Sequence, residues 1–152
     1  MFERDEATGR WNAMHHPFTA PLASEKQFLE TDPSKCHAQA YDLVINGSEA
    51  GGGTIRIHDA ASQQRVFDLL GIDEATARDR FGFLLDALKF GAPPHGGIAL
   101  GIDRWVMLLG GLDNIREVIA FPKNQTGRDV MADAPSEVEP KQVKELHIQI
   151  RE

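Results

Sequence analysis

The chain has 152 residues, a length typical of one domain, and 41% of them are hydrophobic, which is enough to form a core. Its formal net charge of −7 argues against a nucleic-acid-binding surface spread over the whole chain. A single cysteine, Cys36, excludes an intrachain disulfide, and no apolar run approaches the ~20 residues that a membrane-spanning helix needs. We therefore predict a cytoplasmic protein without a membrane span.

The N-terminal part carries one short motif. Residues 14–19, Met-His-His-Pro-Phe-Thr, are predicted to be extended, because proline disfavours a helical conformation in the residue before it. His15 and His16 are adjacent, so in an extended chain they point in opposite directions and do not easily ligate one metal ion. Each could equally be a hydrogen-bonded structural residue. Residues 22–37 are polar and mixed, and we expect a mobile loop there.

A β-hairpin is predicted within residues 38–59. Apolar and polar residues alternate at its start, and Asn46-Gly47 is the strongest short signal for a hairpin turn. This turn would place Asp42 opposite Gly51 and on the same sheet face as Glu49, with the two acidic Cβ atoms roughly 7–8 Å apart. Two carboxylates at that spacing can share a divalent cation whose other ligands are water and phosphate. The alternative is an exposed acidic face.

Arg56 faces the side of this sheet opposite to Glu49 if the second strand is regular. Arg56 lies seven positions after Glu49 in the sequence, and because this spacing is odd, the two side chains would point in opposite directions. Either only one of the two is functional, or a β-bulge within the glycine run 51–53 shifts the register. We predict the bulge. The three glycines also leave the sheet surface clear for a ligand.

Two helices are predicted next, over residues 60–70 and 74–90. Apolar side chains recur at helical spacing in both, and Asp73 is placed to cap the second one. We interpret these helices as core-forming, and we interpret His58 and Asp59 as a polar strand end.

Residues 91–104, Gly-Ala-Pro-Pro-His-Gly-Gly-Ile-Ala-Leu-Gly-Ile-Asp-Arg, are predicted to form a loop, a strand and the start of a helix. On the strand, Gly97, Ala99 and Gly101 face one side, and a surface of such small residues leaves room for a flat ligand. The other side carries the large residues Ile98, Leu100 and Ile102.

Asp103 is a favourable N-cap for a buried helix through residues 105–109, which puts Arg104 in the first helical turn. A buried arginine costs free energy unless an anion meets it. An anionic ligand is one candidate for that partner. The alternative is a local carboxylate beside an ordinary glycine-rich strand.

The C-terminal part is predicted to contain a short turn and a buried strand within residues 115–121, a helix over 141–146 and a strand over 147–151. Together with the hairpin and the glycine-rich strand, this pattern favours the α+β class, with an antiparallel sheet flanked by helices.

Three motifs carry a resemblance to a known family. "GAPPHGGIALGIDR" is similar to the third signature motif of class II aminoacyl-tRNA synthetases and resembles in particular the aspartyl enzymes of bacterial type. "HHPFT" and the pattern "NGxExGGGxxRI", at residues 46–57, are also similar to motifs of the aspartyl-tRNA synthetase family. Ser48 stands where many members carry an aromatic residue.

The resemblance implies an ATP site and a magnesium site. In the family, the small-residue strand carries the adenine, and the arginine at the position of Arg104 binds the γ-phosphate. The resemblance implies that Mg²⁺ is held near Asp42 and Glu49, and that Glu49 and Arg104 act in catalysis. The implied ATP-binding residues are Glu49, Gly101, Ile102, Asp103 and Arg104.

The resemblance also implies an L-aspartate site. Arg56 would hold the side-chain carboxylate of aspartate, a task that suits its planar guanidinium, because this group can donate two parallel hydrogen bonds. His15 is implied as a contact of the substrate, and His16 as its weaker neighbour.

The implied reaction is formation of aspartyl-adenylate from ATP, followed by transfer to tRNA(Asp), in a family whose full-length members are homodimers. Residues 1–152 resemble only the C-terminal portion of the catalytic domain, because the anticodon-binding domain and the first and second signature motifs are absent. We therefore expect the chain to hold part of the site and to be inactive alone. The alternatives are a nucleotide-binding or regulatory module that has lost catalysis, and a purely structural fragment. An asparaginyl or lysyl enzyme fits less well, because "HHPFT" occurs together with Arg56.

Overall fold

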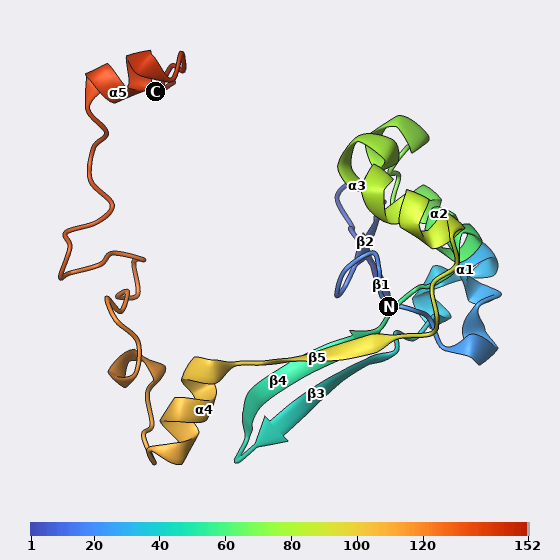
Figure 1. Cartoon of the computed structure of the whole chain (residues 1–152), viewed down its shortest axis with the longest axis horizontal. Helices are drawn as coiled ribbons and strands as arrows, with labels where there is room; N and C mark the ends of the chain where they lie inside the picture. Colours follow the sequence, from blue (N-terminus) through green and yellow to red (C-terminus); the bar gives the residue numbers. More distant parts are fainter. Residues whose placement is uncertain (152) are drawn as a thin grey trace. The chain divides into compact units, whose positions relative to one another are not determined.

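The structure is a computed structural model that describes residues 1–151. It divides into two compact units, Met1–Gly101 and Ile102–Glu152, and each is described by itself (Figure 1). None of the helices described is long and apolar enough to cross a membrane.

The first unit contains two antiparallel sheets and three α-helices. β1 pairs with β2, and β3, β4 and β5 form the second sheet in that spatial order. Two short 3₁₀ turns, Ala23–Glu25 and Pro33–Lys35, flank the first helix. The elements are β1 (Phe2–Arg4), β2 (Trp11–Ala13), α1 (Phe28–Thr31), β3 (Ala40–Ile45), β4 (Ser48–Ile55), α2 (Ala60–Leu69), α3 (Glu74–Lys89) and β5 (Gly96–Leu100).

The predicted hairpin is confirmed as β3 and β4. Its turn residues, Asn46 and Gly47, both have positive φ angles, of 50° and 78°, as a type I′ turn requires. β5 then pairs with β4 in antiparallel orientation, and the three strands lie side by side in Figure 1. The combination of helices with an antiparallel sheet confirms the predicted fold class.

The two predicted core helices are confirmed as α2 and α3. Asp73 caps α3 by accepting a hydrogen bond from the backbone N–H of Thr76 at 2.8 Å. Asp59 caps α2 in the same way, from the N–H of Ser62 at 2.7 Å. The interpretation of Asp59 as a plain strand end was therefore wrong, because its carboxylate satisfies a donor that the first turn of a helix leaves unpaired.

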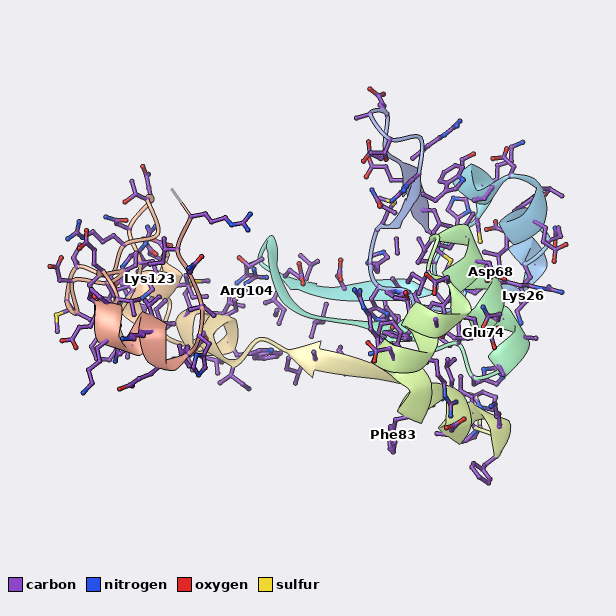
Figure 2. All side chains as sticks on the ribbon, turned by 90° about the horizontal axis from the view of Figure 1, so that it is seen from above. Lys26, Asp68, Glu74, Phe83, Arg104 and Lys123 are labelled. Atoms are coloured by element: carbon purple, nitrogen blue, oxygen red, sulfur yellow. The ribbon has the colours of Figure 1, made fainter. Side chains whose placement is uncertain are left out.

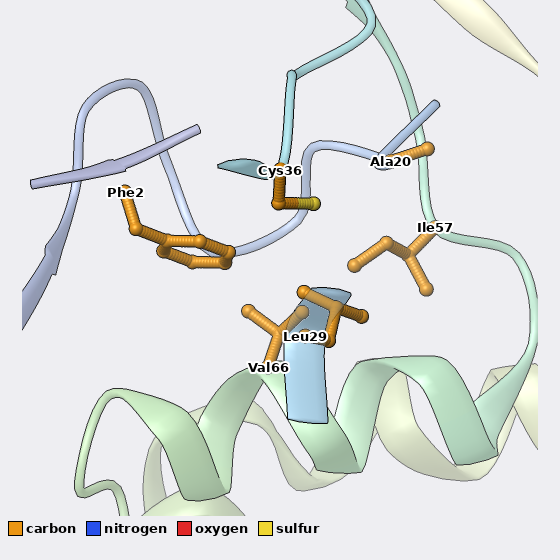
Figure 3. Packing of buried hydrophobic residues seen from close by; sticks show 6 residues of the cluster. All are labelled: Phe2, Ala20, Leu29, Cys36, Ile57 and Val66. Atoms are coloured by element: carbon orange, nitrogen blue, oxygen red, sulfur yellow. The ribbon is translucent and has the colours of Figure 1, made fainter. Parts of the chain in front are cut away.

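The main hydrophobic core joins the N-terminal hairpin to α1, α2 and the chain that follows β4. It consists of Phe2, Ala20, Leu29, Cys36, Ile57 and Val66 (Figure 3).

The prediction of a mobile loop over residues 22–37 was wrong. This segment forms short helical turns that bury Leu29 and Cys36, of which the cysteine is only 1% exposed. Leu29 and Cys36 stand among polar neighbours in the sequence, so the polar composition of the segment conceals its packing. The β1–β2 pair was not predicted at all, because its strands are only three residues long.

In the second unit, α4 (Ile102–Leu109) begins two residues earlier than expected. Asp103 consequently lies in the first turn of the helix and is not its N-cap. α4 contains no buried residue, so the prediction of a buried helix was wrong. Arg104 lies in the first helical turn, as predicted, but it is exposed, so the argument from a buried arginine does not hold.

The rest of the second unit contains little regular structure. The short turn predicted within residues 115–121 is confirmed as the 3₁₀ turn Ile115–Glu117. The strand predicted after it is absent, and Phe121 has a positive φ of 55°. The predicted C-terminal helix is confirmed as α5 (Pro140–Glu145), but its described continuation, residues 147–151, is not a strand. Within the described residues these two segments find no neighbouring strand to pair with, and an unpaired strand is not stable.

Candidate functional site

A β-bulge at Ala50 sets the geometry of the site. Val44 pairs with Glu49 and Leu43 pairs with Gly51, so Ala50 is the extra residue of β4. The predicted bulge therefore exists, but it lies before the glycine run and not within residues 51–53. Ala50 is fully buried, and its carbonyl oxygen accepts a hydrogen bond from Gly101 N at 3.0 Å.

The bulge also corrects the predicted partner of Asp42, which is Gly52 and not Gly51. A Cβ atom at Gly52 would lie 2.8 Å from Asp42 Oδ1 and 3.5 Å from Glu49 Oε1. The two carboxylates therefore lie over the same glycine, on one face of the sheet. A side chain at position 52 would displace them.

Arg56 belongs to this same face. Gly52, Thr54 and Arg56 alternate along the chain on one side, although β4 itself ends at Ile55. The position of His16 supports this, because its imidazole contacts both Thr54 Oγ1, at 3.3 Å, and Arg56 Nη1. The bulge thus resolves the parity conflict between Glu49 and Arg56.

The sheet surface between the acidic and basic residues is bare. Directly opposite Gly52 and Thr54, β5 carries Ala99 and Gly97. A Cβ atom at Gly97 would meet nothing within 4 Å, so this glycine leaves open space. Gly53 points to the opposite face and serves packing, because a Cβ there would lie only 1.9 Å from Gly97 O.

The acidic pair fits a hard divalent cation in part. Among the described residues there is no group of three or more His, Cys, Asp or Glu side chains that could hold a metal ion. Asp42 and Glu49 would supply two carboxylates, and an octahedral Mg²⁺ would need water and phosphate oxygens for its remaining positions.

His16 and Arg56 form the basic end of the site. Arg56 Nη1 lies 3.1 Å from His16 Nδ1 and 2.5 Å from its Nε2. Burial, the neighbouring charge of Arg56 and that of His15 together lower the pKa of His16. Because a guanidinium can only donate, the imidazole must offer it a lone pair, which the neutral form provides.

The structure separates the two predicted histidines. His16 is partly buried against Arg56, whereas His15 is exposed. Their proposed contacts with a substrate stay predictions.

A cavity of about 420 Å³ adjoins Arg56. Its apolar walls include Ile57, Leu84 and Leu88, and Gln63 also lines it. Sequence reasoning missed Gln63. A signal for it was present in the sequence: Gln63 lies three residues before Val66 and four before Phe67 on α2, so it falls on the apolar face of the helix although its side chain is an amide.

The residues predicted to bind the nucleotide are divided between the two units. Gly101 ends the first unit and is bonded to the bulge residue Ala50. Ile102, Asp103 and Arg104 belong to α4 in the second unit; Figure 2 labels Arg104 on this helix. The roles of these four residues toward ATP stay predictions.

Residues 9–125 match the family model described as tRNA synthetases class II (D, K and N). The chain is 71% identical over 148 residues to an aspartate–tRNA(Asp/Asn) ligase of Rhodopirellula baltica, covering 97% of this chain and 25% of that protein. It is 57% identical to the aspartate–tRNA ligase of Flavobacterium psychrophilum, covering 99% of this chain and 26% of that protein. The chain therefore spans about a quarter of the length of these relatives.

Solved structures of the same family have a similar fold. An aspartyl-tRNA synthetase from Entamoeba histolytica aligns with a TM-score of 0.58 and 29% identity, covering 76% of this chain and 21% of that one. An asparaginyl-tRNA synthetase from the same organism, in complex with asparaginyl-adenylate, aligns with a TM-score of 0.60 and 25% identity, covering 76% and 24%. From the family match, the sequence relatives and the shared fold, we conclude that this chain belongs to the class II tRNA synthetases of the D, K and N group.

Proposed function

We propose that the chain forms part of the site at which an aspartate–tRNA ligase activates L-aspartate with ATP. One observation carries the proposal: the bulge at Ala50 brings Asp42, Glu49 and Arg56 to one face of a glycine-rich sheet. An anion-binding group and a cation-binding pair are thereby set at two ends of one open surface. The names of the relatives support aspartate as the amino acid.

At the basic end, Arg56 would bind the side-chain carboxylate of L-aspartate. The guanidinium suits this task because its N–H groups can donate two parallel hydrogen bonds to a carboxylate. A neutral amino acid such as asparagine offers no negative charge and would leave the guanidinium poorly compensated. His15 and His16 are the proposed neighbours of the substrate.

At the other end, the bare surface beside Gly97 and Ala99 would accept the adenine of ATP. Asp42 and Glu49 would hold Mg²⁺, which, when bound, neutralises the phosphate charges. Arg104 would contact the γ-phosphate, with Gly101, Ile102 and Asp103 beside the nucleotide.

The reaction needs no covalent intermediate with the protein. The α-carboxylate of aspartate attacks the α-phosphate of ATP, the bond to the β-phosphate breaks, and aspartyl-adenylate and pyrophosphate are formed. The residues described would act by orientation and by charge, which can together account for large rate effects.

The complete activity belongs to a longer protein. We propose that residues 1–152 are a C-terminal portion of the catalytic domain, that the full protein transfers aspartate to tRNA(Asp), and that it acts as a homodimer in the cytoplasm. The isolated chain is expected not to aminoacylate tRNA.

Calorimetry with ATP, MgCl₂ and L-aspartate tests the proposal. We expect each ligand to bind more tightly in the presence of the other, and L-asparagine to bind more weakly than L-aspartate. Binding of ATP without any effect of aspartate would instead favour a nucleotide-binding module. Pyrophosphate exchange near the rate of a full-length synthetase would refute the expectation that the chain is inactive alone.

A further inference from the structure

Gln63 occupies an unusual position for a polar residue. Its side chain, on α2, is 0% exposed. Nε2 donates a hydrogen bond to the carbonyl oxygen of Pro17 at 2.8 Å. Oε1 is buried and has no hydrogen-bond partner among the described residues. A buried amide with an unpaired oxygen destabilises the fold compared with an apolar side chain of the same size. Stability alone therefore does not explain why an amide that bonds Pro17 stands here.

The Pro17 carbonyl belongs to a turn that carries His16. The N–H of Thr19 donates to His16 O at 3.2 Å, and the N–H of Phe18 points at His16 Nδ1 at 3.2 Å. The turn also packs through Phe18 against Phe67 of α2, with ring centroids 6.1 Å apart. α2 therefore holds the turn by one aromatic contact and one directional hydrogen bond.

His16 lies between this turn and Arg56. Its imidazole lies between two buried hydroxyls, Thr19 Oγ1 near Nδ1 and Thr54 Oγ1 near Nε2, each at 3.3 Å. Arg56 Nη1 meets the same ring. The charged groups that act on the imidazole are Arg56 and His15.

We propose that Gln63 and His16 are positioning residues for the aspartate site: Gln63 fixes the turn, and His16 in turn holds the guanidinium of Arg56. This inference rests on the proposed function, because it assumes that Arg56 binds the substrate carboxylate. A guanidinium held in one orientation loses less conformational freedom when it binds a carboxylate. Gln63 and His16 would therefore raise the affinity for L-aspartate by orienting Arg56.

The first test is independent of any ligand. ¹⁵N NMR of the chain follows the imidazole nitrogens of His16 and the guanidinium Nε of Arg56. Gln63→Met keeps the side-chain length and removes the donor. Gln64→Met makes the same change one residue away, where Gln64 Nε2 donates to Asp68 Oδ1 at an exposed position. We expect the signals of His16 and Arg56 to shift in Gln63→Met and to stay in place in Gln64→Met. Unchanged signals in a folded Gln63→Met chain would overturn the proposal.

The second test separates positioning from general stability. Gln63→Met also removes the orphan Oε1, so the urea midpoint is expected to move little, while L-aspartate affinity falls by about three- to tenfold, the range for one lost hydrogen bond. A parallel loss of stability and affinity would assign Gln63 a merely structural role.

Variants of His16 keep the proposal testable if Gln63→Met does not fold. His16→Gln retains a neutral acceptor and should preserve the Arg56 signal better than His16→Leu, which has none. Equal Arg56 signals in these two variants would overturn the proposal that His16 positions Arg56. Should the unmodified chain bind no L-aspartate, the proposed function fails for this chain, but the NMR comparison still decides whether Gln63 and His16 position Arg56.

Discussion

The two ends of β4 are built in different ways. At the end near the turn, Asp42 and Glu49 come from one hairpin and share a face because Glu49 pairs with Val44, two residues from Asp42. The extra residue Ala50 then brings Arg56 to this face. At the end near Arg56, the supports come from His16 and from α2, which are distant in the sequence. The acidic end depends on local backbone register, and the basic end depends on tertiary packing. A change in one end can therefore be made without disturbing the other.

The largest effect is expected at the basic end. Arg56→Gln removes the charge proposed to meet the substrate carboxylate, and L-aspartate affinity should fall about 100-fold, since charge-assisted hydrogen bonds are stronger than neutral ones. Calorimetry measures the loss. ATP affinity should stay unchanged, because the acidic end is untouched. Arg65→Gln, which removes a surface ion pair with Glu30, is the matched control; an equal loss there would contradict the assignment.

The next prediction concerns the packing of the strands between the two ends. Gly53→Ala places a methyl group where only 1.9 Å separates it from Gly97 O, so the strands must move apart. We expect a loss of about 2 kcal/mol or more in the free energy of unfolding, measured with urea. In Gly97→Ala the added methyl group would enter open space, so this substitution should change the free energy of unfolding by less than about 1 kcal/mol. A similar cost at both positions would mean that the two glycines do not differ in role.

A third prediction isolates the acidic end. Glu49→Gln keeps the shape of the side chain and removes its charge, so the gain in ATP affinity that Mg²⁺ provides should fall about tenfold. Titration of ATP with and without MgCl₂ measures this gain. L-aspartate affinity measured without nucleotide should be unaffected. Glu3→Gln, an exposed residue of β1, provides the control.

The smallest effect is a pH dependence at the basic end. The pKa of His16 is lowered from its ordinary value of 6.5 by burial and by the charges of Arg56 and His15. The unfolded chain consequently takes up a proton at a higher pH than the folded chain does. The stabilising contribution is complete above pH 6.5 and is lost as the pH falls from there toward the folded pKa.

Urea unfolding at a series of pH values measures this contribution. His16→Gln cannot titrate, so its stability should fall less steeply than that of the unmodified chain below pH 6.5. Identical slopes for the two chains would show that His16 does not contribute.

The contrast between the two ends also explains what the sequence could predict. The hairpin, its turn at Asn46-Gly47, the two helices and the Asp73 cap of α3 follow from local signals, and the structure confirms them. The need for a bulge followed from the odd spacing of Glu49 and Arg56. Its position did not, because the hydrogen bond from Gly101 that accompanies the bulge at Ala50 comes from another strand end.

At the basic end, local patterns were insufficient. The contacts of Gln63 with Pro17 and of His16 with Thr54 join segments that no short motif connects. The same limit applies to Cys36, whose polar neighbours in the sequence concealed its place in the core. Long-range pairing, which a single sequence does not display, decided each of these cases.

The hydrogen bond from Gly101 N to Ala50 O provides a natural reporter. A backbone proton held in this way exchanges with deuterium only when the bond opens. The exchange rate of this one amide therefore measures how often the register of β4 is released. Any ligand that clamps the hairpin should slow it, whichever atoms of the protein that ligand touches.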